Sequence, residues 1–171
     1  MRKHITLAVL VSTIATGVAV RPARCAELNG LDFVMSTDKK SYKVGEPIRV
    51  RFTWTNVGVV KLVIPDWRGP TDGVTAFGQG KDEVRDFAVY FEGTEMLPYR
   101  GGFACGIDPE VALESKTTLT RSYTISDVYS FARAGRYVLR SAYFGYAPDN
   151  QSLGHWSGQI VHPDVQIRIH E

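Results

Sequence analysis

The chain has only two cysteines among its 171 residues, and it has no second long apolar run after residue 20. Two cysteines exclude a disulfide-dense scaffold and a zinc site made of four thiolates. The sequence also lacks His-Glu-x-x-His, Gly-x-Ser-x-Gly and a phosphate loop ending in Gly-Lys-Ser/Thr, the signatures of zincins, many serine hydrolases and P-loop proteins. With 44% hydrophobic and 22% charged residues, the chain has the composition and length of one globular domain.

The first 25 residues have the parts of a secretory signal peptide. Arg2 and Lys3 precede the uncharged, mostly apolar run 5–20, which has the small residues Gly17 and Ala19 near its end. This run is shorter than the roughly 20 apolar residues of a comfortable membrane span. We therefore expect a signal peptide over residues 1–25, with cleavage after Ala19 as the alternative. The mature protein is then secreted or periplasmic, with no membrane insertion.

Removal of the leader changes the charge balance of the chain. The full sequence has 20 Lys and Arg against 18 Asp and Glu. Cleavage after Cys25 leaves 16 basic and 18 acidic residues, whereas cleavage after Ala19 leaves 18 of each. The excess of basic residues thus belongs to the leader. Because nucleic-acid binding depends on clustered cationic side chains, we expect no nucleic-acid partner.

From residue 31 onward, apolar and polar residues often alternate, the period of half-buried strands. The pattern is clearest at 48–55, and the predicted strands are residues 31–35, 48–55, 59–64, 87–91, 117–123, 136–144 and 165–169. About seven short strands with turn signals between them favour an all-β antiparallel sandwich. One helical turn is predicted near 126–132, capped by Ser126 and Asp127. We expect a single domain over residues 27–171.

Tyr137 is interpreted as a structural residue. It follows Gly135 at the start of a late predicted strand. In sandwiches of the immunoglobulin type, a tyrosine at such a corner donates a hydrogen bond from its hydroxyl to the backbone of the preceding loop. We expect the same bond here.

Two groups of motifs resemble known secreted domains. Asp-Lys-Lys-Ser-Tyr-Lys-Val-Gly-Glu-Pro-Ile-Arg-Val at 38–50, continuing to Thr55-Asn56, resembles the opening of many secreted immunoglobulin-like domains. Leu-Pro-Tyr-Arg-Gly at 97–101, Leu113 with 118–129, and Gly-Arg-Tyr-Val at 135–138 resemble the later half of one such domain. That domain is the β-sandwich in the N-terminal region of deuterolysin-type (aspzincin) zinc proteases.

The resemblance spans residues 31–143 and implies an immunoglobulin-like sandwich with an accessory role. It implies no peptidase, because the chain lacks the two histidines one helical turn apart and the adjacent glutamate that a zincin requires. A separate domain of this kind acts as a chaperone, an inhibitor or an adhesion module, and the residues leave these roles open.

Three histidines near the C-terminus suggest a different function. His155, His162 and His170 lie within the last 17 residues, with Asp164 nearby. If a final hairpin brought two of them together, they would make a weak zinc or copper site. Their spacings of seven and eight residues match no helical or zinc-finger pattern, so three ordinary surface histidines are the competing interpretation.

The predicted recognition site is the loop 145–158 between the last two strands. Tyr146 and Trp156 flank its polar middle, and His155 lies beside Trp156. Large side chains with polar tips are common in protein interfaces. Trp67 and Arg68, in another long loop, are second contributors. The competing interpretation is that Trp156 folds back over the edge of the core.

We therefore predict a secreted or periplasmic, non-enzymatic module that binds another protein as an inhibitor, chaperone, or assembly or adhesion domain. It requires no cofactor and has no catalytic residues. One alternative is a small secreted metal-binding protein that uses the C-terminal histidines. The other is an enzyme of a type that its motifs do not reveal.

The intact mass of the secreted protein decides its cysteine pairing. With cleavage after Ala19, Cys25 and Cys105 both remain, and we expect one disulfide between them. That chain loses two hydrogens in mass and regains them on reduction. A mature chain that starts at Ala26 excludes the bridge and leaves Cys105 unpaired within the chain.

Overall fold

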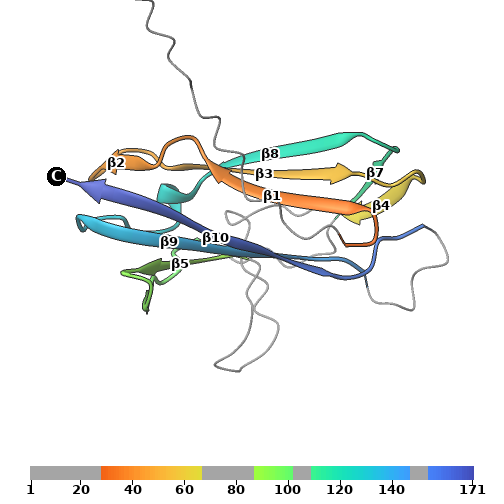
Figure 1. The fold of residues 1–171 in the computed structure, drawn as a ribbon. Helices are drawn as coiled ribbons and strands as arrows, with labels where there is room; N and C mark the ends of the chain where they lie inside the picture. Colours follow the sequence, from red (N-terminus) through yellow and green to blue (C-terminus); the bar gives the residue numbers. More distant parts are fainter. Residues whose placement is uncertain (1–27, 67–86, 102–108, 147–153) are drawn as a thin grey trace, which may run out of the picture.

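The fold is an all-β sandwich of two facing sheets with a small third sheet at one end (Figure 1). A computed structural model describes residues 28–66, 87–101, 109–146 and 154–171. Its elements are β1 (Leu31–Thr37), β2 (Ser41–Lys43), β3 (Arg49–Asn56), β4 (Leu62–Pro65), β5 (Phe87–Phe91), β6 (Glu95–Met96), β7 (Glu110–Leu113), β8 (Thr118–Thr124), the 3₁₀ turn η1 (Ile125–Asp127), β9 (Gly135–Phe144) and β10 (Gln159–His170). Across the described residues no helix is long and apolar enough to cross a membrane.

The first sheet has the order β1-β3-β8 and the second has the order β2-β10-β9-β5-β6. Neighbours pair antiparallel except for β2, which runs parallel to β10. β4 and β7 form the third sheet. This division of strands, with the early strand β1 in one layer and the late strands β9 and β10 in the other, matches an immunoglobulin-like sandwich. The predicted all-β antiparallel sandwich is confirmed, and the one parallel pair among the described strands is β2 with β10.

All seven predicted strands are present, but several differ in their bounds. The predicted strand at 59–64 begins only at Leu62, because Val59 and Val60 lie in an exposed turn. The final strand begins at Gln159 rather than Val165 and carries a bulge between His162 and Val165. β2, β6 and β7 were not predicted, since segments of two to four residues are too short to show a period.

The predicted helical segment is reduced to η1. Its N-terminal cap residue is Thr124, whose side chain makes no capping bond, so the expected capping by Ser126 and Asp127 is wrong. The Ser126 hydroxyl instead accepts a hydrogen bond from the backbone N–H of Ile48, at 3.3 Å. This side chain therefore serves the neighbouring strand and not the helical turn.

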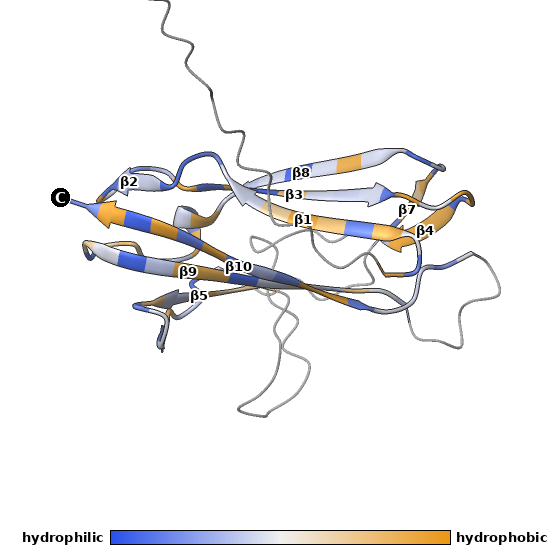
Figure 2. Cartoon of the chain, in the orientation of Figure 1, coloured by the Kyte–Doolittle hydropathy of each residue, from blue (hydrophilic) through white to orange (hydrophobic). Residues whose placement is uncertain are grey.

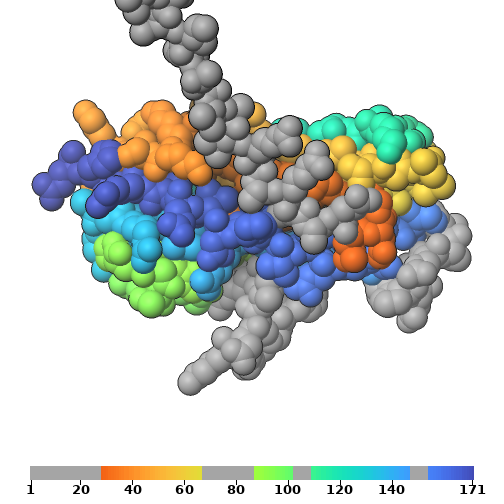
Figure 3. Space-filling view, in the orientation of Figure 1, coloured from red at the N-terminus to blue at the C-terminus, as the bar shows by residue number. Residues whose placement is uncertain are grey.

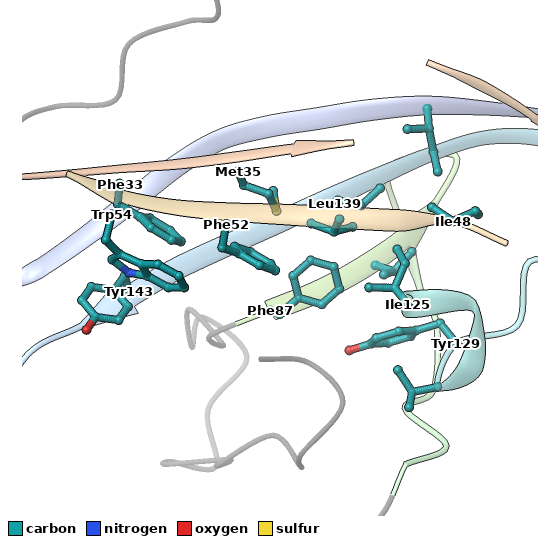
Figure 4. Packing of buried hydrophobic residues seen from close by; sticks show 14 of the residues in the cluster. Phe33, Met35, Ile48, Phe52, Trp54, Phe87, Ile125, Tyr129, Leu139 and Tyr143 are labelled. Atoms are coloured by element: carbon teal, nitrogen blue, oxygen red, sulfur yellow. The ribbon is translucent and has the colours of Figure 1, made fainter. Parts of the chain in front are cut away.

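The core between the two large sheets is rich in aromatic rings (Figure 4). The inward positions of β3, which are Val50, Phe52 and Trp54, are at most 1% exposed. The alternation that the sequence shows at 48–55 is therefore the alternation of the folded strand. Opposite-facing Arg49 and Arg51 are exposed to solvent.

Tyr137 lies at the start of β9 and is fully buried. Its hydroxyl donates to the backbone carbonyl of Arg133 at 2.9 Å, and its ring packs edge-on against Phe91 and tilted against Phe131. The bond joins the strand to the loop before it, which is the geometry of the tyrosine corner.

Replacement of Tyr137 by phenylalanine removes this bond and keeps the ring. We expect Y137F to lower the free energy of unfolding by about 1 kcal/mol, the net value of a typical hydrogen bond. Chemical denaturation measures the change. An unfolding free energy equal to that of the wild type would show that the bond has no structural role.

Candidate functional site

Several loops end close together at the end of the sandwich that holds β4, here called the loop end. On one side of β4, the N–H of Asp66 donates to the Pro109 carbonyl at 2.6 Å. On the other side, the N–H of Val63 donates to Gly154, and the Val63 carbonyl accepts from Trp156. The N–H of Tyr146 donates to the Trp156 carbonyl. The backbone of β4 and of Asp66 after it thereby holds residues of the predicted loop 145–158 and of the segment before β7 in place.

Trp156 belongs to the core and not to an exposed binding surface. Its side chain is 2% exposed, and its ring stacks on Tyr143 with centroids 5.6 Å apart. The indole N–H donates to the Leu28 carbonyl at 3.0 Å. An indole can be buried at low cost when its N–H finds such a partner. Of the two interpretations of Trp156, the structure thus supports the one in which it covers the core edge.

Tyr146 and His155 lie together, as their shared loop predicts, and the structure adds Glu110 to them. The Tyr146 and His155 rings are 4.4 Å apart, and His155 Nε2 lies 3.1 Å from Glu110 Oε1. The His155 side chain is only 10% exposed, whereas that of Glu110 is 55% exposed. Sequence reasoning missed Glu110 because it reaches His155 only through the pairing of β7 with β4.

This cluster combines an imidazole, a carboxylate and a phenol ring at the surface. An imidazole–carboxylate pair can hold or exchange a proton, and the aromatic face can stack on an incoming group. Trp67 and Arg68, the other predicted contributors, lie outside the described residues, as do Cys25 and Cys105.

The three C-terminal histidines have three different neighbours in the described structure, which therefore gives the metal-site alternative no support. His170 bonds to the Ser41 hydroxyl at 2.7 Å, and eight residues of one strand separate it from His162, or about 25 Å at strand spacing. His155 faces Glu110 at the loop end. Among the residues that the structure describes, no three His, Cys, Asp or Glu side chains group to hold a metal ion.

The loop end also carries an exposed apolar tip, the turn between β3 and β4. Val59 and Val60 are 84% and 64% exposed, and the most exposed strand valine in the described chain, Val161 of β10, is 56% exposed. The sequence assigned both to a strand, because β-branched residues favour strands. Their exposure is therefore a result that only the fold shows.

Asn56, the last residue of β3, holds this tip in one shape. Its side chain is fully buried, and its amide nitrogen donates to the carbonyls of Val60, at 2.7 Å, and Leu113, at 2.9 Å. Its amide oxygen accepts from the N–H of Gly58 at 3.0 Å. The Ser115 hydroxyl bonds the Gly58 carbonyl, and the Lys116 ammonium contacts the Val57 carbonyl. The valines are thus presented on a fixed backbone.

Comparisons with known proteins give no family for this chain. No family model and no curated protein match the sequence. Two solved structures that resemble it are a β-glucosidase from Listeria innocua in complex with gluconolactone and in complex with glucose. Their sequence identities are 10% and 12%, with TM-scores of 0.34 and 0.33. The match covers 82% of this chain and 16% of the glucosidase chains, and scores this low support no functional argument.

His162 is a buried histidine at the bulge of β10. It is 6% exposed and packs edge-on against Phe33, 6.2 Å between centroids. Its Nδ1 lies near the Pro163 carbonyl, and its buried Nε2 has no hydrogen-bond partner among the described residues. Burial lowers the pKa of His162 below the ordinary 6.5, and the Pro163 carbonyl, Asp32 and Asp164 offset this only in part.

We expect His162 to make the protein less stable in mild acid. Its contribution is fully present above the unfolded-state pKa of 6.5 and is lost as the pH falls from there through the lower pKa of the folded state, because the unfolded chain binds the proton first. H162Q removes this titration. Melting temperatures recorded from about pH 7 to pH 5 should therefore fall less steeply for H162Q than for the wild type.

H170Q is the matched control, since His170 is an exposed residue at the end of the same strand. Its melting temperature should follow the wild-type pH dependence. Equal slopes for wild type and H162Q would contradict the assignment.

Proposed function

We propose that this protein is a secreted or periplasmic, non-enzymatic module that binds another protein through the loop end of its sandwich. The observation that carries the proposal is the pair Val59 and Val60, which are 84% and 64% exposed on a turn held by buried Asn56. Side chains this exposed gain little stability from burial within the fold. On a fixed turn they bind a partner without paying the entropy of ordering a loop.

The surroundings of the tip fit the same role. Val63 of β4 bridges to His155, and Pro65 at the end of β4 pairs with Glu110. The Tyr146–His155–Glu110 cluster therefore flanks the strand that follows the tip. An apolar contact with polar groups beside it is the usual anatomy of a protein interface. The role as inhibitor, chaperone or adhesion domain follows from the partner's identity.

Serine at both tip positions tests the proposal. The bonds that Asn56 makes in the turn go to backbone atoms, so V59S/V60S keeps them, and its stability should change by less than about 1 kcal/mol. In affinity capture from the extracellular or periplasmic fraction of the source cells, we expect the variant to lose a protein that the wild type retains.

Val161 offers a matched control, because it is 56% exposed on β10. V161S should capture the same protein as the wild type. If V59S/V60S, folded and as stable as expected, captures the same protein in the same amount, the tip is not the contact and the proposal fails.

A further inference from the structure

β8 is the long strand with an open edge in the described part of the sandwich. It ends the order β1-β3-β8, whereas the opposite edge strand, β1, packs against β10. The edge strands of the second sheet, β2 and β6, have only three and two residues. β8 has seven and lies along the upper margin of its layer (Figures 1 and 3).

The register of the β3–β8 pair shows which backbone groups face this open edge. Bonds from Ile125 N–H to Ile48 and from Asn56 N–H to Thr117 bracket the ladder. Bonded and non-bonded pairs alternate between them, so the odd-numbered residues of β8 bond β3. The N–H and C=O groups that point away from β3 belong to Thr118, Thr120, Ser122 and Thr124.

β8 also lacks the features by which proteins usually block such an edge. It has no proline, glycine, lysine or bulge, and its one charged side chain, Arg121, is paired with Asp66 at 3.1 Å. Its inward residues Leu119 and Tyr123 pack against the core, but part of each side chain remains exposed to solvent. In Figure 2 β8 is mostly pale with an orange band. An added strand would cover the exposed parts of Leu119 and Tyr123.

We propose that the open edge of β8 binds an extended segment of another protein as an additional strand, and that this segment has acidic side chains on its outer face. The charge follows from Arg49 and Arg51, which are exposed on the outer face of β3, opposite Thr124 and Ser122. In the described structure neither arginine has an ion pair. The added strand would lie two strand spacings, about 10 Å, from β3. An arginine side chain from β3 and a glutamate side chain from the added strand can together span this distance.

The same arginines disfavour a second copy of this chain as the occupant. Pairing β8 with β8 would continue one sheet through both copies and place two pairs of arginines on one face. Like charges on one face of a sheet repel. An acidic segment instead gains backbone hydrogen bonds from the edge, apolar contacts with Leu119 and Tyr123, and attraction to the arginines.

The first test uses two synthetic seven-residue peptides, one alternating valine with glutamate and one alternating valine with lysine. The mature protein should bind the glutamate peptide and bind the lysine peptide at least roughly tenfold more weakly. T120P removes one N–H from the open edge and none from the β3 ladder, and proline is tolerated at such a position. We expect T120P to weaken binding of the glutamate peptide by roughly tenfold, whereas T120A, which keeps the N–H, should bind like the wild type.

A second pair of variants leaves the β8 backbone unchanged. R49E/R51E should lose affinity for the glutamate peptide and gain it for the lysine peptide, because the outer face changes sign. K40E/K43E makes the same change of charge at exposed lysines of and beside β2 and should keep the wild-type preference. All variants are first checked for an unchanged melting transition.

Each other result overturns the proposal. Binding of neither peptide at millimolar concentration, or equal binding by wild type and R49E/R51E, would do so. A dimer that forms with concentration and disappears in T120P would assign the edge to a second copy. This surface is separate from the Val59–Val60 tip, so V59S/V60S should bind the glutamate peptide normally, and the two proposals can fail independently.

Discussion

The contact of aromatic rings across the two sheets is the interaction on which the other features depend. Phe33 of β1 lies 5.5 Å from both Trp54 of β3 and Tyr143 of β9, so one ring joins neighbouring strands and facing layers. Tyr143 then stacks on Trp156 and donates its hydroxyl to the Pro65 carbonyl at the end of β4. The same cluster that closes the core therefore sets the position of the loop end. A substitution that loosens these rings would disturb both the stability of the core and the shape of the loop end.

The long strands were predictable because one face of each is buried, and burial imposes a two-residue period that the sequence must carry. Ile48–Trp54 shows this period without interruption. β10 shows it only after Asp164, because the bulge at His162 shifts the side chains and hides the first half of the strand. β2 could not be found, since its three residues gain their partner from the other end of the chain. Its parallel direction is a property of topology and leaves no local pattern.

The sequence predicted where Tyr146 and His155 lie in the fold, but not all the residues that surround them. A loop joining the last two strands of a sandwich must lie at one end, and Tyr146 and His155 are found there. Glu110 depends on the pairing of two four-residue strands. The sequence could not distinguish a covering tryptophan from an exposed one, because the Leu28 carbonyl that receives the Trp156 N–H lies 128 positions away in the sequence. The valine tip was misassigned because propensity favours a strand where the Asn56 side chain enforces a turn.

The pairing of β2 with β10 has a consequence for the order in which the chain can fold. Residues 41–43 obtain their partner only from residues 168–170, and β9 also depends on β10 for its longest ladder. Contacts so distant in sequence slow folding, because the loop between them must close before the contacts form. The second sheet is therefore incomplete until residues 168–170 have left the ribosome. A chain exported as it is made would cross a membrane without this sheet, and the sandwich would close only on the far side.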